Sequence, residues 1–283
     1  MIHKIKAFID VLRESNNPFK MIVGQILVKS GLNRFLTISM NGYKINFSRS
    51  ALAVTFFADS NDRHEDELVL KRLLKQGGVY VDIGANIGTL VLAASTFVGN
   101  SGKVIAVEAH PATFGYLKEN VELNKFSNIE LINAAAGNKA GSISFSNINS
   151  DDQNKVLIQN ENGIKVELDT LDNLLSSETA IDLLKIDVEG YEKFVLEGAT
   201  STLNKTKIVF YESWEKHFNG FGYYTSDVIN IFRENGFTVY KLEADSLLPL
   251  SSTYKSVNCE NLLAVKDIQL FCATYQFSLK PLN

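Results

Sequence analysis

An α/β fold with a mostly parallel central sheet is predicted by three features of the sequence. Short apolar runs and helical patterns alternate from residue 79 onward, as they do in parallel sheets covered by helices on both faces. One apolar run leads directly into a loop flanked by Gly84 and Gly88. The 283 residues are 45% hydrophobic and 21% charged, which is typical of a globular protein. The length suits one large domain with an appendage, so we expect an extension over residues 1–50 and a main domain over residues 51–283.

The extension is predicted to contain two helices and a hairpin. The first helix has four apolar residues at helical spacing, Ile5, Phe8, Ile9 and Leu12. The second is expected over residues 19–29, with Gly31 as its C-cap. A hairpin is expected over residues 36–48 around the turn dipeptide Asn41-Gly42. Packing on the main domain is the expected role; a homo-oligomer contact, a cover over the substrate and contact with a membrane surface are the alternatives.

The main domain is predicted to begin with a helix over residues 64–75. Seven strands are then expected in the main sheet: 79–84, 103–109, 129–135, 181–186, 207–211, 237–242 and 261–265. Helices are expected between them, near 88–98, 111–124, 191–203 and 226–235. Short alternating β segments at 142–146, 155–159 and 164–169 suggest an insertion or an antiparallel extension. The polar link over residues 243–260 is expected to be irregular.

The loop after the first strand predicts a nucleoside-binding site. Its glycines let the backbone turn sharply and approach a ligand without a Cβ clash. The helix that follows directs backbone N–H groups and a partial positive charge at the loop. Glu108 ends the second strand at about the spacing from Asp82 where an acid accepts hydrogen bonds from ribose hydroxyls. A strand–turn–helix without a ligand is the alternative, and the acid at position 108 counts against it.

The residues of this loop favour S-adenosylmethionine over NAD. A loop that binds NAD needs the pattern G-x-G-x-x-G, so that the pyrophosphate can lie against bare backbone. Here Asn86 and Thr89 stand where two of those glycines should be. The carboxylate of Asp82 would repel a pyrophosphate, whereas it suits the amino group and sulfonium of S-adenosylmethionine. An NAD-dependent oxidoreductase is the rival enzyme.

Ligands of open α/β sheets bind beyond the carboxyl ends of the strands, so we assign the cofactor site to residues there. Asp82 is expected near the methionine part of the cofactor and Glu108 on its ribose. Asn133 or its neighbour Ala134 is expected to border the adenine. The full predicted set is Asp82, Gly84, Ala85, Asn86, Gly88, Glu108, Asn133, Ala134 and Asp187.

Methyl transfer to a hydroxyl also needs a group that removes the proton of the acceptor. Asp187 is the first candidate, because its strand should adjoin the first strand and place it near the reactive methyl. Glu212 and His217 are the next candidates, and Glu189 lies close to Asp187 in the sequence. The carboxylates of Asp187, Glu189 and Glu212 could instead hold Mg²⁺, although no chelating spacing singles out a metal.

The segment from Trp214 to Tyr224 is rich in aromatic residues and contains Gly220 and Gly222. Its rings could stack on a sugar or a planar acceptor, or they could pack as part of a lid. For His217 within this segment, a packed surface histidine is the alternative to a catalytic role.

Several of these segments together resemble the FkbM methyltransferase family. They are Val81 to Gly88, Val107-Glu108, Leu168 to Asp172 and Leu184 to Glu192, and their order and spacing match over about residues 64–265. Lys-Ile-Asp-Val-Glu-Gly-x-Glu, within the last segment, is the more specific signature. Glu212 also stands where that family usually has an acid ending strand five. The chain departs from the family at Ala109-His110, where members often have Pro-Asn.

The resemblance implies a Rossmann-like class I methyltransferase fold, seven-stranded and mostly parallel with an antiparallel last strand. It implies transfer from S-adenosylmethionine, usually to oxygen, with S-adenosylhomocysteine as product. Family acceptors include natural-product hydroxyls and sugars of glycans, and we expect a hydroxyl of a sugar, glycan or glycosylated metabolite. The alternatives are a non-sugar natural product, a protein side chain, or a non-catalytic cofactor-binding protein of the same fold.

The charge and the cysteines limit the partners of the protein. A net charge of −4 and a pI near 5.7 argue against a general nucleic-acid binder, so we expect a small-molecule or glycan acceptor. Cys259 and Cys272 form neither a disulfide framework nor a metal motif. No signal peptide or transmembrane segment is visible, and a cytoplasmic location is therefore expected.

Overall fold

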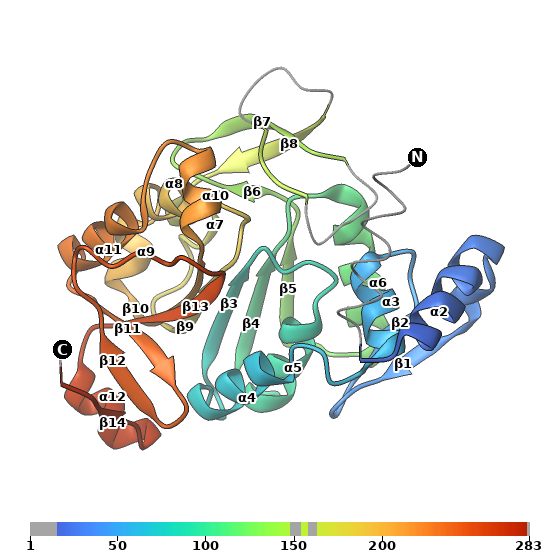
Figure 1. Cartoon of the computed structure of the whole chain (residues 1–283), viewed down its shortest axis with the longest axis horizontal. Coiled ribbons are helices and arrows are strands. Elements are labelled where there is room, and N and C mark those ends of the chain that lie inside the picture. The colour runs from blue at the N-terminus through green and yellow to red at the C-terminus, as the bar shows by residue number, and fades with distance from the viewer. Residues whose placement is uncertain (1–15, 148–153, 158–162, 282–283) are drawn as a thin grey trace.

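The computed structural model describes residues 16–147, 154–157 and 163–281, and a nine-stranded sheet forms its centre (Figure 1). The strand order is β14-β12-β11-β13-β10-β9-β3-β4-β5. The seven predicted strands are β3 (Val79–Ile83), β4 (Lys103–Val107), β5 (Ile129–Ile132), β9 (Ile181–Ile186), β10 (Thr206–Ser213), β11 (Thr238–Glu243) and β13 (Glu260–Val265). Strands β5, β4, β3, β9 and β10 pair in parallel, and β13 is antiparallel to both of its neighbours. The predicted fold class is confirmed.

The expectation of an irregular link over residues 243–260 was wrong in its first part. A turn with Ala244 at φ +52° folds β12 (Ser246–Pro249) back onto β11 as an antiparallel strand. The side chain of Leu247 is fully buried there, so the strand extends the core of the sheet. A short strand β14 (Ser278–Leu279) then pairs in parallel with β12.

Helices cover both faces of the sheet, as predicted. They are α4 (His64–Leu73), α5 (Thr89–Val98), α6 (Pro111–Asn124), α7 (Leu171–Leu174), α8 (Glu192–Glu197), α9 (Thr200–Asn204), α10 (Glu215–Gly220), α11 (Thr225–Glu234) and α12 (Ile268–Tyr275). The single helix expected over residues 191–203 is divided into α8 and α9. The carboxylate of Asp172 accepts hydrogen bonds from the N–H groups of Ser201 and Thr202, and these bonds start α9 as a separate helix.

The alternation of side chains along the strands divides the core into two clusters, one on each face. Tyr80 of β3 joins the cluster of α4 and α5, whereas Val81 and Ile83 join the cluster of α8, α9 and α11. The same alternation turns Asp82 toward the face of Tyr80. Lys185 of β9 lies between Leu184 and Ile186, which belong to the second cluster, so its side chain also points to the face of Tyr80.

A second, three-stranded sheet lies beyond the tips of β3 and β4 (Figure 1). It consists of β6 (Ala135–Ala136), β7 (Gly141–Phe145) and β8 (Ile164–Asp169). Two of the predicted alternating segments, 142–146 and 164–169, form its antiparallel pair. The third predicted segment, 155–159, contributes a bridge between Val156 and Phe145, and its residues 158 and 159 lie outside the described part of the chain.

The N-terminal elements lie at one edge of the molecule (Figure 1). They are α2 (Pro18–Ser30), the 3₁₀ helix η1 (Leu32–Phe35), β1 (Thr37–Ser39), β2 (Lys44–Asn46) and α3 (Ala51–Ala58). Helix α2, its left-handed cap at Gly31 (φ +75°) and the β1–β2 hairpin were predicted, whereas α3 was not. The helix predicted over Ile5 to Leu12 lies outside the described residues. Within the described ranges, no helix combines the length and apolarity that crossing a bilayer requires.

Side-chain amides connect the hairpin to helix α6. Asn124 donates through Nδ2 to the carbonyl of Lys44 (2.6 Å) and accepts from the N–H of Lys44 (2.8 Å). Asn120 accepts from the N–H of Asn46 (2.7 Å) and donates to the carbonyl of Ile87 (2.8 Å), in the glycine loop. Helix α6 therefore links the hairpin to the loop that was predicted to bind the cofactor.

Candidate active site

The glycine loop between β3 and α5 is shaped by close backbone contacts. A Cβ at Gly84 would lie 1.8 Å from the carbonyl oxygen of Asp187, and Gly84 has φ +82°. A Cβ at Gly88 would lie 2.3 Å from Leu117 of α6, and Gly88 has φ +89°. Asn86, between them, also adopts the left-handed conformation. Glycine is thus required at both positions, because a larger residue would clash with the chain after β9 or with α6. The loop shaped in this way directs the N-terminus of α5 toward the ends of the strands.

The carboxylate of Glu108 holds this loop against the end of β4. One oxygen accepts a hydrogen bond from the N–H of Asn86 (2.9 Å) and the other from the N–H of His110 (2.8 Å). The side chain is 8% exposed. A carboxylate at the end of this strand is the group that accepts hydrogen bonds from ribose hydroxyls in nucleoside-binding folds.

A pocket opens where the predicted cofactor residues meet. Gly84, Asn86, Glu108, Ala134 and Asp187, five residues of the predicted cofactor set, line it together. Further lining comes from Arg63, Ala109, Phe145, Glu189 and Tyr191. Small residues at positions 84, 109 and 134 leave room for a flat ring, and Glu108 stands at the wall.

Four other residues of the predicted set are absent from the lining of this pocket: Asp82, Ala85, Gly88 and Asn133. Asn133 is exposed, and its Nδ2 donates to the carbonyls of Glu108 and Ala109. Gly88 contacts Leu117, and Ala85 donates its N–H to the carbonyl of Val107. These residues support the walls of the pocket from behind.

Asp82 is buried beneath the pocket, beside a lysine that the sequence analysis did not single out. Its side chain is 1% exposed, and its Oδ1 lies 3.5 Å from Nζ of Lys185. The same Nζ lies 3.1 Å from Oδ2 of Asp187. Burial raises the pKa of Asp82, and Lys185 opposes that rise. Burial also works against ionised Asp187, but the charge and hydrogen bond of Lys185, together with the charge of Arg63, outweigh it, so the pKa of Asp187 lies below its usual value.

Arg63 is a second functional candidate that the sequence analysis missed. It precedes α4 with φ +57° and lines the pocket together with Asp187. Its positive charge lowers the pKa of Asp187 and works against the raised pKa values of Asp66 and Glu212. A single arginine before an acidic helix belongs to no recognisable sequence motif. Its place at the pocket depends on the fold.

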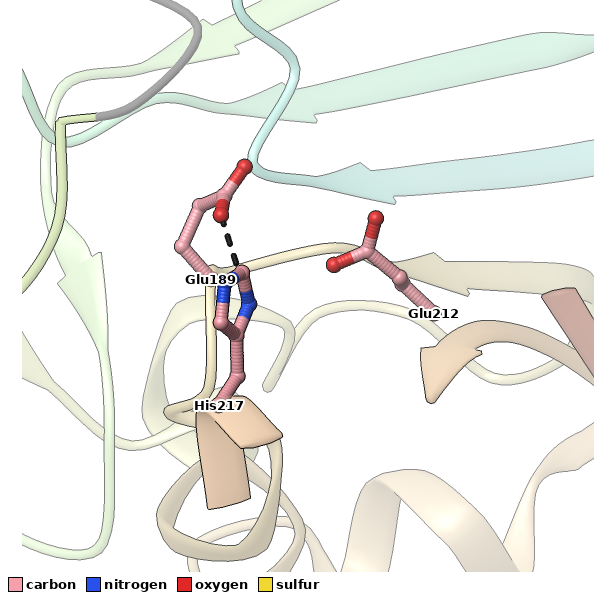
Figure 2. A group of neighbouring side chains, drawn as sticks. All are labelled: Glu189, Glu212 and His217. Atoms are coloured by element: carbon pink, nitrogen blue, oxygen red, sulfur yellow. Dashed lines mark ion pairs between the residues drawn. The ribbon is translucent and has the colours of Figure 1, made fainter. Parts of the chain in front are cut away.

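Glu189, Glu212 and His217 form a group at the ends of β9, β10 and the start of α10 (Figure 2). One ligand atom from each lies within 4.8 Å of the others, and Nδ1 of His217 is 3.5 Å from a carboxylate oxygen of Glu189. Burial and the charge of Asp187 raise the pKa of Glu212 to about 7, although Cys259 donates to its Oε1. Burial lowers the pKa of His217. These donors can accept a proton or hold a divalent cation.

The loop after β9 presents both Asp187 and Glu189 and is held by Glu192. Glu189 and Gly190 have φ of +56° and +98°. The Oε1 of Glu192 accepts hydrogen bonds from the N–H groups of Val188 (3.0 Å) and Gly190 (3.4 Å). Glu192 is 1% exposed, and burial raises its pKa to about 8. The last acid of the predicted signature therefore shapes the loop from within the core.

The aromatic segment predicted as a possible lid is largely packed. Phe218 and Tyr223 are buried with their rings stacked, and the hydroxyl of Tyr223 donates to the carbonyl of Gly190 (2.7 Å). Trp214 remains at the site, with its ring centroid 4.2 Å from that of His217. Of the rings in this segment, Trp214 is the one that lies against a predicted catalytic side chain.

Comparison with known proteins connects this site to an enzyme family. Residues 82–239, more than half of the chain, match the model of the methyltransferase FkbM domain. A hexuronic acid methyltransferase, AglP of Haloferax volcanii, is 29% identical over 195 residues, which are 66% of this chain and 78% of that protein. The matches to four further curated relatives span between 25% and 57% of their lengths.

Two solved structures are similar at low identity. A precorrin-6y C5,15-methyltransferase from Geobacter metallireducens is 15% identical, with a TM-score of 0.43 over 71% of this chain and 89% of that one. An O-methyltransferase dependent on S-adenosylmethionine, from Thermotoga maritima, is 14% identical, with a TM-score of 0.40 over 73% and 64%. The family match, which includes the glycine loop, Glu108 and the loop after β9, is the finding that identifies the chain. The protein belongs to the FkbM methyltransferase family and is a methyltransferase that uses S-adenosylmethionine.

Proposed function

We propose that the protein transfers a methyl group from S-adenosylmethionine to a hydroxyl of a sugar, in a glycan or a glycosylated metabolite. The observation that carries this proposal is the group of Glu189, Glu212 and His217 (Figure 2), of which Glu189 lines the pocket. A hydroxyl is a weak nucleophile until a base removes its proton. Side chains that can take up a proton therefore suit a substrate whose hydroxyl receives the methyl group. A substrate that is already a good nucleophile does not need such a base.

The pocket fits the parts of the cofactor by its chemistry. Glu108 lines the pocket at the end of β4, where an acid suits the ribose hydroxyls, and the small side chains of Ala109 and Ala134 suit the adenine. The ionised carboxylate of Asp187 suits the positive charge of the methionine part. When bound, S-adenosylmethionine supplies an electrophilic methyl group, and the protein must align the acceptor oxygen with it.

Glu212 is the best candidate for the base. Its pKa of about 7 makes it a proton acceptor in the neutral range, where general bases are most effective. Asp187 is the weaker candidate, because its ion pair with Lys185 keeps its pKa low. Asp187 is then better suited to hold the positively charged cofactor. This order reverses the one predicted from the sequence.

A sugar acceptor is supported by two observations. The indole ring of Trp214 lies beside His217, at the place where an acceptor would meet the base. Flat aromatic rings offer an apolar surface to the C–H face of a sugar, while the hydroxyls stay available to polar groups. The relative that is 29% identical is a hexuronic acid methyltransferase, and its acceptor is therefore a sugar acid.

Label transfer tests this proposal. The purified protein would be incubated with methyl-labelled S-adenosylmethionine and a cell extract divided into glycan, small-metabolite, protein and nucleic-acid pools. We expect label in the glycan or metabolite pool. Label confined to the protein pool, or to a metabolite without a sugar, would overturn the sugar assignment. Binding of S-adenosylhomocysteine without transfer to any pool would favour the non-catalytic alternative.

Substitution of Glu212 tests its role in the same assay. Glu212→Gln should lower transfer by about 100-fold or more, since a general base contributes at least that factor. Glu167→Gln, at an exposed position on β8, is the matched control and should transfer as the wild type does. Calorimetry with S-adenosylhomocysteine should give the same affinity for both variants. A fully active Glu212→Gln would contradict the assignment of the base.

The same assay with EDTA separates proton acceptance from assistance by a cation. Glu189, Glu212 and His217 offer ligands that also suit a divalent cation. Unchanged transfer in EDTA is the result expected if Glu212 acts directly on the proton. Loss of transfer in EDTA, with recovery on adding Mg²⁺, would assign the three side chains to a metal instead.

A further inference from the structure

Helix α2 has apolar side chains on two opposite faces. One face packs against α3: Met21 is buried, and Gly24 is so close that a Cβ there would lie 3.2 Å from Val54 and from Phe57. This contact fixes the orientation of α2 on the body of the protein. A surface helix with one packed face normally turns polar residues to the solvent on the other.

The outer face of α2 is apolar instead. Phe19, Ile22 and Ile26 are 75%, 41% and 59% exposed, and their spacing of three and four residues places them on one side of the helix. The 3₁₀ helix η1 follows at once and packs on α2, and it adds Leu32 and Phe35 at 54% and 70% exposure. We call these five side chains the α2 surface. Several large apolar side chains in contact with water on neighbouring segments are typical of a docking site.

The charges around the α2 surface differ in sign from those of the whole protein. Residues 16–50 contain Lys20, Lys29, Arg34, Lys44 and Arg49 but no Asp or Glu, whereas the chain carries a net charge of −4. Lys20, Lys29 and Arg34 are exposed and stand within the same segments as the α2 surface. Asp59, which follows α3 and is hydrogen-bonded to Asn16, lies near enough to Lys20 for the lysine to lower its pKa. The segments that carry the apolar side chains nevertheless supply cations and no acid, and this combination matches the surface of a bilayer with anionic headgroups.

The charges also argue against a second copy of the chain as the occupant of this surface. Two copies related by a twofold axis would bring the same patch against itself. Such a pairing would bring the cations of one copy near those of the other, with no acid from the same segment between them. A bilayer surface supplies negative charge and an apolar interior at the same time.

We infer that the α2 surface docks the protein onto the surface of a membrane that contains anionic lipids. Phe19, Ile22 and Ile26 enter the boundary between headgroups and acyl chains, and Lys20 and Lys29 contact the headgroups. Helix α2 lies along the bilayer in this arrangement and does not cross it. This inference is independent of the sugar acceptor and of the base.

Vesicle sedimentation with the full-length protein tests the apolar part of the inference. We expect sedimentation with vesicles of phosphatidylcholine and phosphatidylglycerol, and none with phosphatidylcholine alone. The variant Phe19→Ser/Ile26→Ser should remain in the supernatant. The matched control is Val257→Ser/Leu270→Ser, which replaces side chains that are 75% and 62% exposed elsewhere, and it should sediment as the wild type does.

A second pair of variants tests the charges. Lys20→Gln/Lys29→Gln/Arg34→Gln should partition about 100-fold more weakly, because each cation near an anionic surface contributes about fivefold. The control replaces the exposed Lys139, Lys165 and Lys255 by Gln and should change partitioning far less. Higher salt should weaken binding of the wild type in the same direction.

Three outcomes would overturn the inference. The wild type could fail to sediment with either kind of vesicle. The variants of the α2 surface could sediment as well as the wild type. Light scattering could detect a dimer of the wild type that Phe19→Ser/Ile26→Ser abolishes, which would assign the surface to a second copy. Unchanged binding of S-adenosylhomocysteine to each variant would exclude unfolding as the cause of any loss.

Discussion

The Nζ of Lys185 lies 3.5 Å from Oδ1 of Asp82, and both side chains are at least 95% buried. Their strands β9 and β3 are parallel neighbours, and the register pairs these two residues directly. The same Nζ lies 3.1 Å from Asp187, at the point where the chain leaves the sheet. One buried cation thus joins an acid beneath the pocket to an acid that lines it.

We predict that Lys185→Met strongly destabilises the protein. Methionine fills a similar volume, but the substitution leaves Asp82 and Asp187 without their cation in a buried site. Removal of one partner of a buried pair costs about 3–5 kcal/mol. Urea unfolding would measure this loss. Lys207→Met, which breaks the exposed pair with Asp182, is the control and should cost at most about 1 kcal/mol. Equal losses in the two variants would contradict the central role of Lys185.

Ala134 and Asn133 provide a test of where the adenine binds. Ala134 lines the pocket and is 3% exposed, so Ala134→Leu should fill the space beside Ala109. Overpacking of about 1–3 kcal/mol corresponds to roughly 5- to 150-fold weaker binding of S-adenosylhomocysteine. Asn133→Ala should change this affinity little, because Asn133 is exposed and outside the lining. Calorimetry would measure the affinity of both variants for S-adenosylhomocysteine. Weaker binding by Asn133→Ala and unchanged binding by Ala134→Leu would place the adenine at Asn133.

The dependence of activity on pH should report the ionisation of Glu212. A base must be deprotonated to act, and the pKa of this carboxyl is raised to about 7. We therefore expect kcat/KM to rise as the pH passes through about 7 and to fall below it. In Glu212→Gln the residual activity should lose this rise. A wild-type profile that is flat through this range would show that Glu212 does not have to lose a proton.

Glu192 should make the stability depend on pH in an unusual direction. Its pKa is about 8 in the folded protein, against an ordinary value of 4.5, so the folded state holds a proton that the unfolded state has released. This contribution to stability is complete below pH 4.5 and is lost as the pH rises through 8. Glu192→Gln keeps the acceptor oxygen for Val188 and removes the ionisation.

Melting temperatures measured across this range would test the prediction. The difference in stability between Glu192→Gln and the wild type should grow with pH, by at most about 1.4 kcal/mol per unit. Glu197→Gln, at an exposed position on the same helix, should keep the wild-type dependence. A constant difference between Glu192→Gln and the wild type would indicate that the carboxyl is ionised throughout.

Periodicity and loop chemistry predicted most of the fold because they act locally. The run Val79 to Ile83 and the glycines after it specify a strand and a turn by themselves. Strand β12 was missed because the interpretation of residues 243–260 as a polar link passed over the short apolar run at Leu247, Leu248 and Leu250, which pairs with β11. The division between α8 and α9 was missed because the capping acid, Asp172, comes from a distant segment.

The site was predictable where its residues belong to motifs. Gly84, Glu108 and Asp187 follow strands, and parallel strands bring such residues to one edge of a sheet. Lys185 begins the Lys-Ile-Asp-Val-Glu-Gly-x-Glu signature, but its ion pairs were not predicted, because only the register places it opposite Asp82. Arg63 was overlooked because its position depends on the packing of the chain before β3.

The side-chain amides of Asn120 and Asn124 should protect the chain from aggregation through an exposed strand edge. Strand β2 belongs to an isolated two-stranded hairpin, and unpaired strand edges recruit strands of other molecules into aggregates. Here the backbone groups of Lys44 and Asn46 are already occupied by side chains of a helix. Helix α6 thus takes the place that a neighbouring strand would occupy. Few backbone groups along that edge of the hairpin are left to pair with a strand of another molecule.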